Sequence, residues 1–242
     1  MSGHSKWSTI KHQKAANDAK RGKLFSKLSK DITVAVNEGG GPDINSNAKL
    51  RLVIEKAKVA NMPKDNIQRA IDKGAKKGDV SQLETIFYEG FAPGNIAVVV
   101  ECVTDNRSRC MQAIKMFFDK QGGRLGSSGA TSYLFDQKGC VWVRKQEDEE
   151  AQALKLIDCG AEDIEIEKAV LKVYTTPEKL HQVVKEIDKQ EFKIQDARLI
   201  FKPKLIKEVE NQENIEKLKK FLIGLDELED VQRVFSEIEL AI

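Results

Sequence analysis

The chain has 242 residues, 40% of them hydrophobic and 32% charged, so it can form one to three domains and is too apolar for wholesale disorder. Its longest apolar run, residues 96–100, is far shorter than the roughly 18 residues of a membrane helix. The net charge of +2 conceals an asymmetry: residues 1–77 carry 17 Lys and Arg against seven Asp and Glu, and the remaining 165 residues carry 23 against 31.

This asymmetry predicts that the basic end binds polyanions while the acidic remainder keeps the molecule soluble. No apolar stretch follows the basic N-terminus, so we expect no secretory signal and a cytoplasmic protein. A mitochondrial transit peptide is also basic and poor in acids, but the first 30 residues are rich in Lys and contain a single Arg.

The first 79 residues predict a small domain of three helices. Residues 1–22 are polar and basic with little periodicity, which indicates an extended arm. From Gly22, apolar residues recur at three- and four-residue spacing as far as Val36, and the breaker at residues 39–42 follows. Two further helices are expected over residues 45–61 and 65–74, separated by Met62-Pro63.

Beyond residue 80 the pattern alternates between strands and helices. Strands are expected at 85–88, 96–103, 132–135, 140–143, 169–174, 197–201 and 232–239, with a turn at 136–139. Helices are expected from Asn106 to about residue 121, over 148–159, from Pro177 and over 215–223. Short helices between strands of alternating polarity favour α+β sandwiches, and we expect two ferredoxin-like modules.

No catalytic signature occurs in a suitable context, so we expect no enzyme and no small-molecule substrate. The four cysteines form no CxxC pair and the three histidines are scattered, which predicts buried, reduced thiols, no metal and no cofactor. Two polar segments leave alternatives open. The glycine-rich run 122–129 could cradle a phosphate or merely connect a helix to a strand, and Asp105-Asn106-Arg107 could be a site or a helix cap.

Cations concentrate at the N-terminus around a single tryptophan, and a second group follows on the second predicted helix. Lys and Arg neutralise phosphates and release counterions, a Trp ring can stack on an unpaired base, and a His can donate a hydrogen bond to phosphate or ribose. The candidate nucleic-acid-binding residues are Lys6, Trp7, Lys11, His12, Lys14, Lys20, Arg21, Lys23, Lys27, Lys30, Lys49 and Arg51.

Several motifs in one register resemble the YebC/PmpR family, and the match thins after about residue 140. They are Gly3-His4-Ser5-Lys6-Trp7, Ile10-Lys11-His12-Gln13-Lys14, residues 21–28 (RGKLFSKL), residues 61–67 (NMPKDNI), Tyr88-Glu89-Gly90, Thr104-Asp105-Asn106-Arg107 and Gly122-Gly123.

The resemblance implies an α+β protein with an N-terminal three-helix domain followed by two small α/β-sandwich domains. It also implies that the C-terminal segment completes the central domain. We therefore expect a basic helical domain over 1–79, a discontinuous central domain over 80–135 plus 204–242, and an inserted acidic domain over 136–203.

The resemblance also implies a regulator of gene expression, but of two possible kinds. The family is described as cytoplasmic transcriptional regulators that bind promoter DNA, and it resembles a mitochondrial translational activator of cytochrome oxidase subunit one. The primary prediction is a DNA-binding transcriptional regulator, and the alternative is a ribosome-associated translation factor that binds ribosomal RNA. No helix-turn-helix with base-reading side chains is evident, and an extended arm with one Trp suits irregular RNA. A third reading is a protein–protein adaptor whose exposed sheet faces bind a regulatory partner, with acidic modules that act as spacers or contact a basic protein.

Overall fold

The computed structural model describes residues 3–76, 83–209 and 211–238, with side chains from residue 18 onward. The chain divides into two compact units, Met1–Val80 and Ser81–Ile242. The three-domain division expected from the sequence stays a prediction. No helix in the described part of the chain is long and apolar enough to span a membrane.

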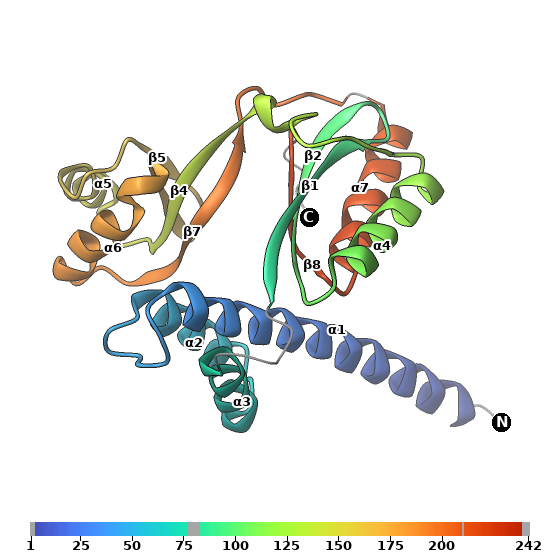
Figure 1. The fold of residues 1–242 in the computed structure, drawn as a ribbon, viewed down its shortest axis with the longest axis horizontal. Helices are drawn as coiled ribbons and strands as arrows, with labels where there is room; N and C mark the ends of the chain where they lie inside the picture. Colours follow the sequence, from blue (N-terminus) through green and yellow to red (C-terminus); the bar gives the residue numbers. More distant parts are fainter. Residues whose placement is uncertain (1–2, 77–82, 210, 239–242) are drawn as a thin grey trace. The chain divides into compact units, whose positions relative to one another are not determined.

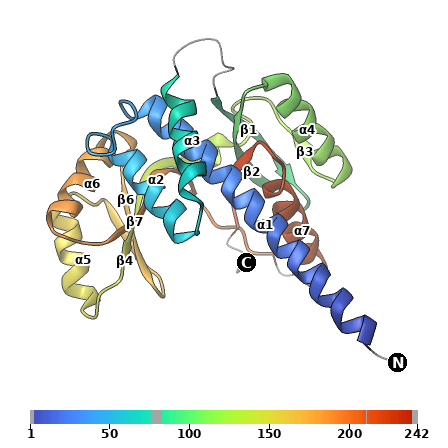
Figure 2. The same cartoon turned by 90° about the horizontal axis from the view of Figure 1, so that it is seen from below.

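The N-terminal unit consists of the helices α1 (Gly3–Glu38), α2 (Ala48–Val59) and α3 (Lys64–Ala75). Both shorter helices pack against the C-terminal half of α1 (Figure 2). Their apolar residues recur at three- and four-residue spacing, which places them on one face of each helix. The shared core consists of Leu28, Ile32, Ala35, Val36, Leu50, Ile54, Ala57, Met62, Ile67, Ala70 and Ile71.

Helix α1 is continuous from Gly3, whereas the sequence predicts an arm up to residue 22. The expectation of an extended arm is therefore wrong for the backbone of residues 3–22. This stretch has no apolar stripe, so hydrophobic periodicity cannot detect it. It nevertheless contains four Lys and three Ala, which favour helix, and it contains no proline.

The buried side chain of Asn47 joins the end of α1 to the start of α2. Its Oδ1 accepts a hydrogen bond from the Leu50 N–H at 2.9 Å, which caps α2. Its Nδ2 donates to the carbonyl oxygens of Ala35 at 2.8 Å and Gly41 at 2.9 Å. Helix α2 therefore begins after Asn47 rather than at residue 45, because an N-cap residue is itself not helical.

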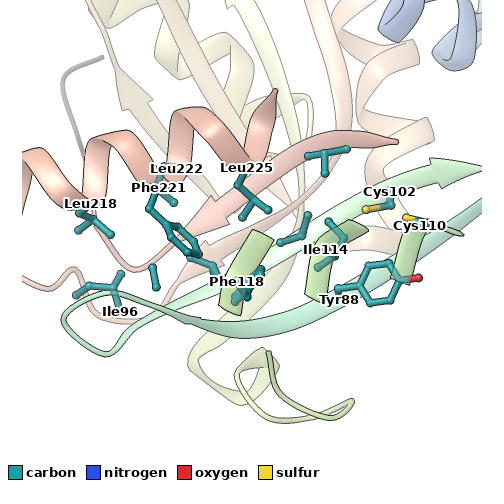
Figure 3. Close-up of a cluster of buried hydrophobic side chains, with 14 of the residues drawn as sticks. Tyr88, Ile96, Cys102, Cys110, Ile114, Phe118, Leu218, Phe221, Leu222 and Leu225 are labelled. Carbon is teal, nitrogen blue, oxygen red and sulfur yellow. The ribbon is translucent and has the colours of Figure 1, made fainter. Parts of the chain in front are cut away.

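In the second unit, one antiparallel sheet has the strand order β3-β1-β2-β8. Strands β1 (Glu84–Ala92) and β2 (Ile96–Thr104) form a hairpin, and the short β3 (Arg124–Leu125) and the distant β8 (Val231–Ser236) flank it. Helices α4 (Arg107–Lys120) and α7 (Gln212–Asp226) cover one face (Figure 1). Phe118 and Phe221 meet edge to face in the core between them, with ring centroids 5.2 Å apart (Figure 3).

The other antiparallel sheet has the order β5-β6-β4-β7. Its strands are β4 (Phe135–Arg144), β5 (Asp163–Ile166), β6 (Val170–Thr175) and β7 (Ile194–Pro203). Helices α5 (Glu149–Asp158) and α6 (Leu180–Lys189) complete a β-α-β-β-α-β unit. This is the ferredoxin-like arrangement, whereas the first sheet begins with a hairpin. The expected class, helices followed by two α+β modules, is confirmed.

The turn expected at residues 136–139 is absent, because these residues lie within the continuous strand β4. Gln137 pairs with Phe201, and Gly139 pairs with both Thr175 and Leu199. A Cβ on Gly139 would lie 2.7 Å from Cγ2 of Thr175 and 3.0 Å from Cβ of Leu180. The glycine therefore allows a close approach of α6 to the sheet. A short 3-10 turn, Ser132–Leu134, replaces the strand expected at 132–135.

The start of β4 and the end of β7 lie against one face of the first sheet, the face that α4 and α7 do not cover (Figure 1). Phe201 on β7 lies 5.3 Å from Phe87 and 5.5 Å from Phe235, measured between ring centroids. Phe135 and Val99 are buried in the same cluster. Aromatic contacts thus connect the two sheets.

Candidate nucleic-acid interface

Four lysines form a stripe along one side of α1, namely Lys20, Lys23, Lys27 and Lys30, which we call the lysine stripe. Their spacing of three, four and three residues places them on one face, because a helix turns once every 3.6 residues. Leu28 and Ile32 are buried on the other side of the same helix. The stripe therefore points away from the core and extends for about 15 Å along the axis.

The side chains of the lysine stripe are accessible to a partner to different degrees. Lys20 and Lys23 are exposed, whereas Lys27 and Lys30 are half-buried. Arg21 is also exposed but lies off the stripe. Phosphate contact needs only a reachable ammonium at the end of a flexible stem, so all four lysines can contribute.

The two candidate cations on α2 differ in their surroundings. The Lys49 ammonium lies 2.5 Å from a Glu38 carboxylate oxygen, an ion pair that links α2 to the end of α1. Arg51 is exposed on the same helix. Lys49 is thus partly neutralised within the unit.

The remaining candidates are the first five in the chain, Lys6, Trp7, Lys11, His12 and Lys14. Their backbone belongs to α1, but their side chains lie outside the described residues. The helical backbone removes one argument made from the sequence, since an extended arm was the reason to favour irregular RNA.

Helix α3 carries a second row of cations that the sequence prediction did not include. Arg69 and Lys73 are exposed and lie four residues apart on α3, and the exposed Lys76 follows directly after its last residue. The same spacing rule that indicates a core face could have identified this row. Gln68 is exposed, and glutamine side chains can form hydrogen bonds with base edges, but the Nε2 of Gln68 donates to Oδ1 of Asp72 at 2.8 Å.

The glycine-rich run does not form a phosphate cradle, because a carboxylate occupies the backbone amides that follow it. The buried Glu89 accepts hydrogen bonds from the N–H groups of Gly129 at 2.9 Å, Thr131 at 2.7 Å and Ser132 at 2.7 Å. Burial opposes the ionisation of Glu89, but these amides outweigh it and hold its pKa below the usual value. The segment is a fixed connection.

The segment Asp105-Asn106-Arg107 serves as a helix cap. Oδ1 of Asn106 accepts from the N–H of Arg109 at 3.0 Å. The Arg109 guanidinium in turn pairs with Asp105 at 3.0 Å and with Asp230 at 3.2 Å, next to β8. These contacts tie α4 to the sheet and account for the polar residues.

The thiols are placed for packing. All four cysteines are free and buried, as expected, and burial raises the pKa of Cys140 to about 12. A thiol with such a pKa remains protonated and is a poor nucleophile. In the part of the chain that the structure describes, no group of three or more His, Cys, Asp or Glu is arranged to hold a metal ion.

Known proteins resemble the chain over nearly its whole length. A relative from Aquifex aeolicus is 45% identical over 99% of this chain and 96% of its own, and one from Bacillus licheniformis is 44% identical over 98% and 100%. Both are named probable transcriptional regulatory proteins. The crystal structure of the conserved hypothetical protein Aq1575 from Aquifex aeolicus matches with a TM-score of 0.81 and 44% identity, over 92% of this chain and 91% of that one.

Two family models match consecutive parts of the sequence. The model of the TACO1/YebC N-terminal domain matches residues 5–77, and that of the TACO1/YebC second and third domain matches residues 83–238. The first match contains the lysine stripe and the second contains both sheets. The chain therefore belongs to the TACO1/YebC family.

Proposed function

We propose that the protein regulates gene expression by binding nucleic acid through its basic N-terminal unit, with the lysine stripe of α1 contacting the phosphate backbone. The observation that carries this proposal is the stripe itself. Four lysines share one face of a helix whose opposite face is buried, in a segment with ten more basic than acidic residues. The names of the relatives support a regulator.

Binding of this kind is driven by the release of counterions from the nucleic acid. The acidic excess of residues 78–242 opposes phosphate, so the second unit should face away from the bound strand. The orientation of the protein is then set by its own charge distribution. Cytoplasmic location is part of the same proposal.

DNA is the first candidate target, because transcription is what the names of the relatives describe. One observation supports the alternative, a ribosome-associated translation factor that binds ribosomal RNA. The stripe consists of lysine alone, which contacts phosphate without selecting a base, whereas a promoter-specific regulator needs side chains that read base edges.

The test compares two variants with the same change in net charge. The first replaces Lys20, Lys23 and Lys27 with Glu. The control replaces three exposed lysines of α4 and α7 with Glu, namely Lys115, Lys120 and Lys220. Affinity for duplex DNA should fall strongly only in the first variant. The slope of log affinity against log salt should become shallower by about three, since each lost phosphate contact removes about 0.9.

Equal losses in both variants would contradict a specific interface, provided that circular dichroism shows both to be folded. The same two variants also distinguish promoter DNA from the ribosome as the target. A promoter shift assay and co-sedimentation with purified ribosomes are run side by side at matched salt. Loss of the promoter shift alone identifies a transcriptional regulator, and loss of ribosome binding alone identifies a translation factor.

A further inference from the structure

Helix α5 presents a face of large apolar side chains to solvent. Leu154 is 65% exposed and Ile157 is 53% exposed, whereas Gln152, Leu156 and Cys159 are buried on the other side. The spacing of three residues between Leu154 and Ile157 places them next to each other on the helix.

Acidic side chains surround this apolar pair. Glu150 lies four residues before Leu154, and Asp158 lies four residues after it, so both share its face. Residues 147–167 as a whole contain nine Asp and Glu and a single Lys. The apolar face therefore lies in the most acidic segment of the chain.

The acids on this face differ from their neighbours in having no cation of their own. Glu149 pairs with Lys145 at 2.7 Å, Glu162 with Lys138 at 2.9 Å, and Glu165 with Lys202 at 2.8 Å. Within the described ranges, no Lys or Arg forms an ion pair with Glu147, Glu150 or Asp158. Their negative charge remains available to a partner.

The geometry of α5 is fixed before any partner binds. Oδ1 of Asp148 caps the helix by accepting from the N–H of Ala151 at 2.9 Å. The buried Gln152 donates to the carbonyl of Arg144 at 2.9 Å and accepts from the N–H of Gln146 at 2.9 Å. Such hydrogen bonds hold the exposed face in one orientation, which lowers the entropy lost on binding.

We propose that the outward face of α5, formed by Glu150, Leu154, Ile157 and Asp158, together with Glu147 just before the helix, docks a basic amphipathic segment of another protein. Charge complementarity defines this occupant, because a Lys- or Arg-rich helix with an apolar face would meet both the carboxylates and the leucine–isoleucine pair. The same charges repel nucleic acid. The surface is separate from the lysine stripe, and the proposal does not depend on the proposed function.

The probe is a 16-residue helical peptide with Leu on one face and Lys on the others, titrated into the full-length ¹⁵N-labelled protein. A peptide with Glu in place of Lys and another with Ala in place of Leu serve as matched probes. We expect chemical-shift changes confined to α5 and its adjoining loops for the Lys/Leu peptide. Both matched probes should bind at least tenfold more weakly.

Two pairs of variants test the residues. Leu154→Ala with Ile157→Ala, and Glu150→Lys with Asp158→Lys, should each weaken binding of the Lys/Leu peptide at least tenfold. The control, Met111→Ala with Met116→Ala on α4, removes two other exposed apolar side chains and should change affinity less than twofold. Binding of nucleic acid should be unaffected in all three, which separates this test from that of the lysine stripe.

Three results would overturn the proposal. Peptide affinity that responds to Glu150 and Asp158 but not to Leu154 and Ile157 would indicate bulk charge attraction without a docking face. Shift changes at α5 on addition of RNA or duplex DNA would assign the face to nucleic acid. A concentration-dependent dimer that the Leu154 and Ile157 variants abolish would assign it to a second copy of the chain.

Discussion

The side chain of Glu89 shows how one carboxylate can organise a glycine-rich segment. It accepts three backbone hydrogen bonds within 2.7–2.9 Å, from Gly129, Thr131 and Ser132. The backbone carbonyl of Glu89 accepts a fourth from the N–H of Gly126 at 2.8 Å. The path of the connection into β4 is therefore set by a residue on β1 together with the glycines, of which Gly122 and Gly129 have positive φ.

We expect Glu89→Gln to lower the free energy of unfolding by about 2 kcal/mol at neutral pH, because one amide oxygen cannot replace a carboxylate that accepts three N–H groups. The lowered pKa means that ionised Glu89 stabilises the folded state above about pH 4.5, and that this stabilisation is lost as pH falls through the folded-state pKa. The difference between wild type and variant should shrink accordingly in urea denaturation at decreasing pH.

The exposed Glu84, on the same strand, provides the control. Glu84→Gln should change stability by less than about 0.5 kcal/mol at every pH. A Glu89→Gln variant with wild-type stability at neutral pH would show that the amides are satisfied without the carboxylate.

Trp7 yields a prediction that rests on the sequence, since its side chain lies outside the described residues. A ring that stacks on an unpaired base contributes roughly 1–3 kcal/mol, which corresponds to about a five- to hundredfold change in affinity. Trp7→Ala should weaken binding to ribosomes or structured RNA by this factor and change duplex affinity little, whereas Trp7→Phe should retain most of the binding.

The comparison of nucleic acids decides the role of Trp7. A similar loss on RNA and duplex DNA would indicate that Trp7 is structural and docks onto the helical domain. A loss confined to a promoter duplex would favour the transcriptional regulator over the translation factor.

Gly22 and Gly74, in two helices of the N-terminal unit, have opposite roles. In α1, a Cβ added at Gly22 would meet nothing within 4 Å. In α3, a Cβ added at Gly74 would lie 2.8 Å from the Thr33 carbonyl oxygen and 2.8 Å from Cβ of Val36. The first glycine is a weak point of a helix, and the second allows two helices to approach closely.

We expect Gly22→Ala to stabilise the N-terminal unit by about 0.5–1 kcal/mol through its higher helix propensity. Gly74→Ala should destabilise it by about 1–3 kcal/mol, because the added methyl forces α3 away from α1. Thermal unfolding followed by far-ultraviolet circular dichroism measures both. Equal effects of the two substitutions would contradict the close packing of α3 on α1.

In the second unit, Phe201 carries the aromatic contacts between the two sheets. Its ring lies against Phe87 and Phe235 of the first sheet, while its backbone belongs to the second. Few side chains have this position, because only the ends of β4 and β7 extend beyond their own helices (Figure 1). The coupling between the sheets should therefore depend strongly on this residue.

Phe201→Ala should destabilise this unit by about 2–3 kcal/mol, somewhat less than for a fully buried phenylalanine. The substitution should also allow one sheet to unfold without the other. Hydrogen exchange of backbone amides on β2 and on β6 should then give two different free energies of opening instead of one shared value. Leu199→Ala, at an exposed position on the same strand, is the control. Unchanged, common exchange in the Phe201 variant would refute this role.

Local patterns in the sequence were sufficient for most elements. The cap at Asn106 was one of two readings of its segment, and it could be read from the sequence because a capping side chain bonds to a backbone amide only two or three residues away. The buried strand β2 follows equally from its run of apolar residues along the chain. These features depend on neighbours in sequence, so the sequence alone contains the information.

Other features depend on partners far away in the chain, and only the folded arrangement reveals them. Glycine is common in turns, but Gly139 lies in strand β4, where it leaves room for Leu180 of α6. The backbone N–H of Gly129, at the end of the glycine-rich run, is bonded to the carboxylate of Glu89, which lies 40 residues earlier in the chain. The exposure of Leu154 and Ile157 is equally invisible in a pattern of apolar residues. Periodicity identifies which side chains share a face, but what covers that face depends on contacts between distant segments.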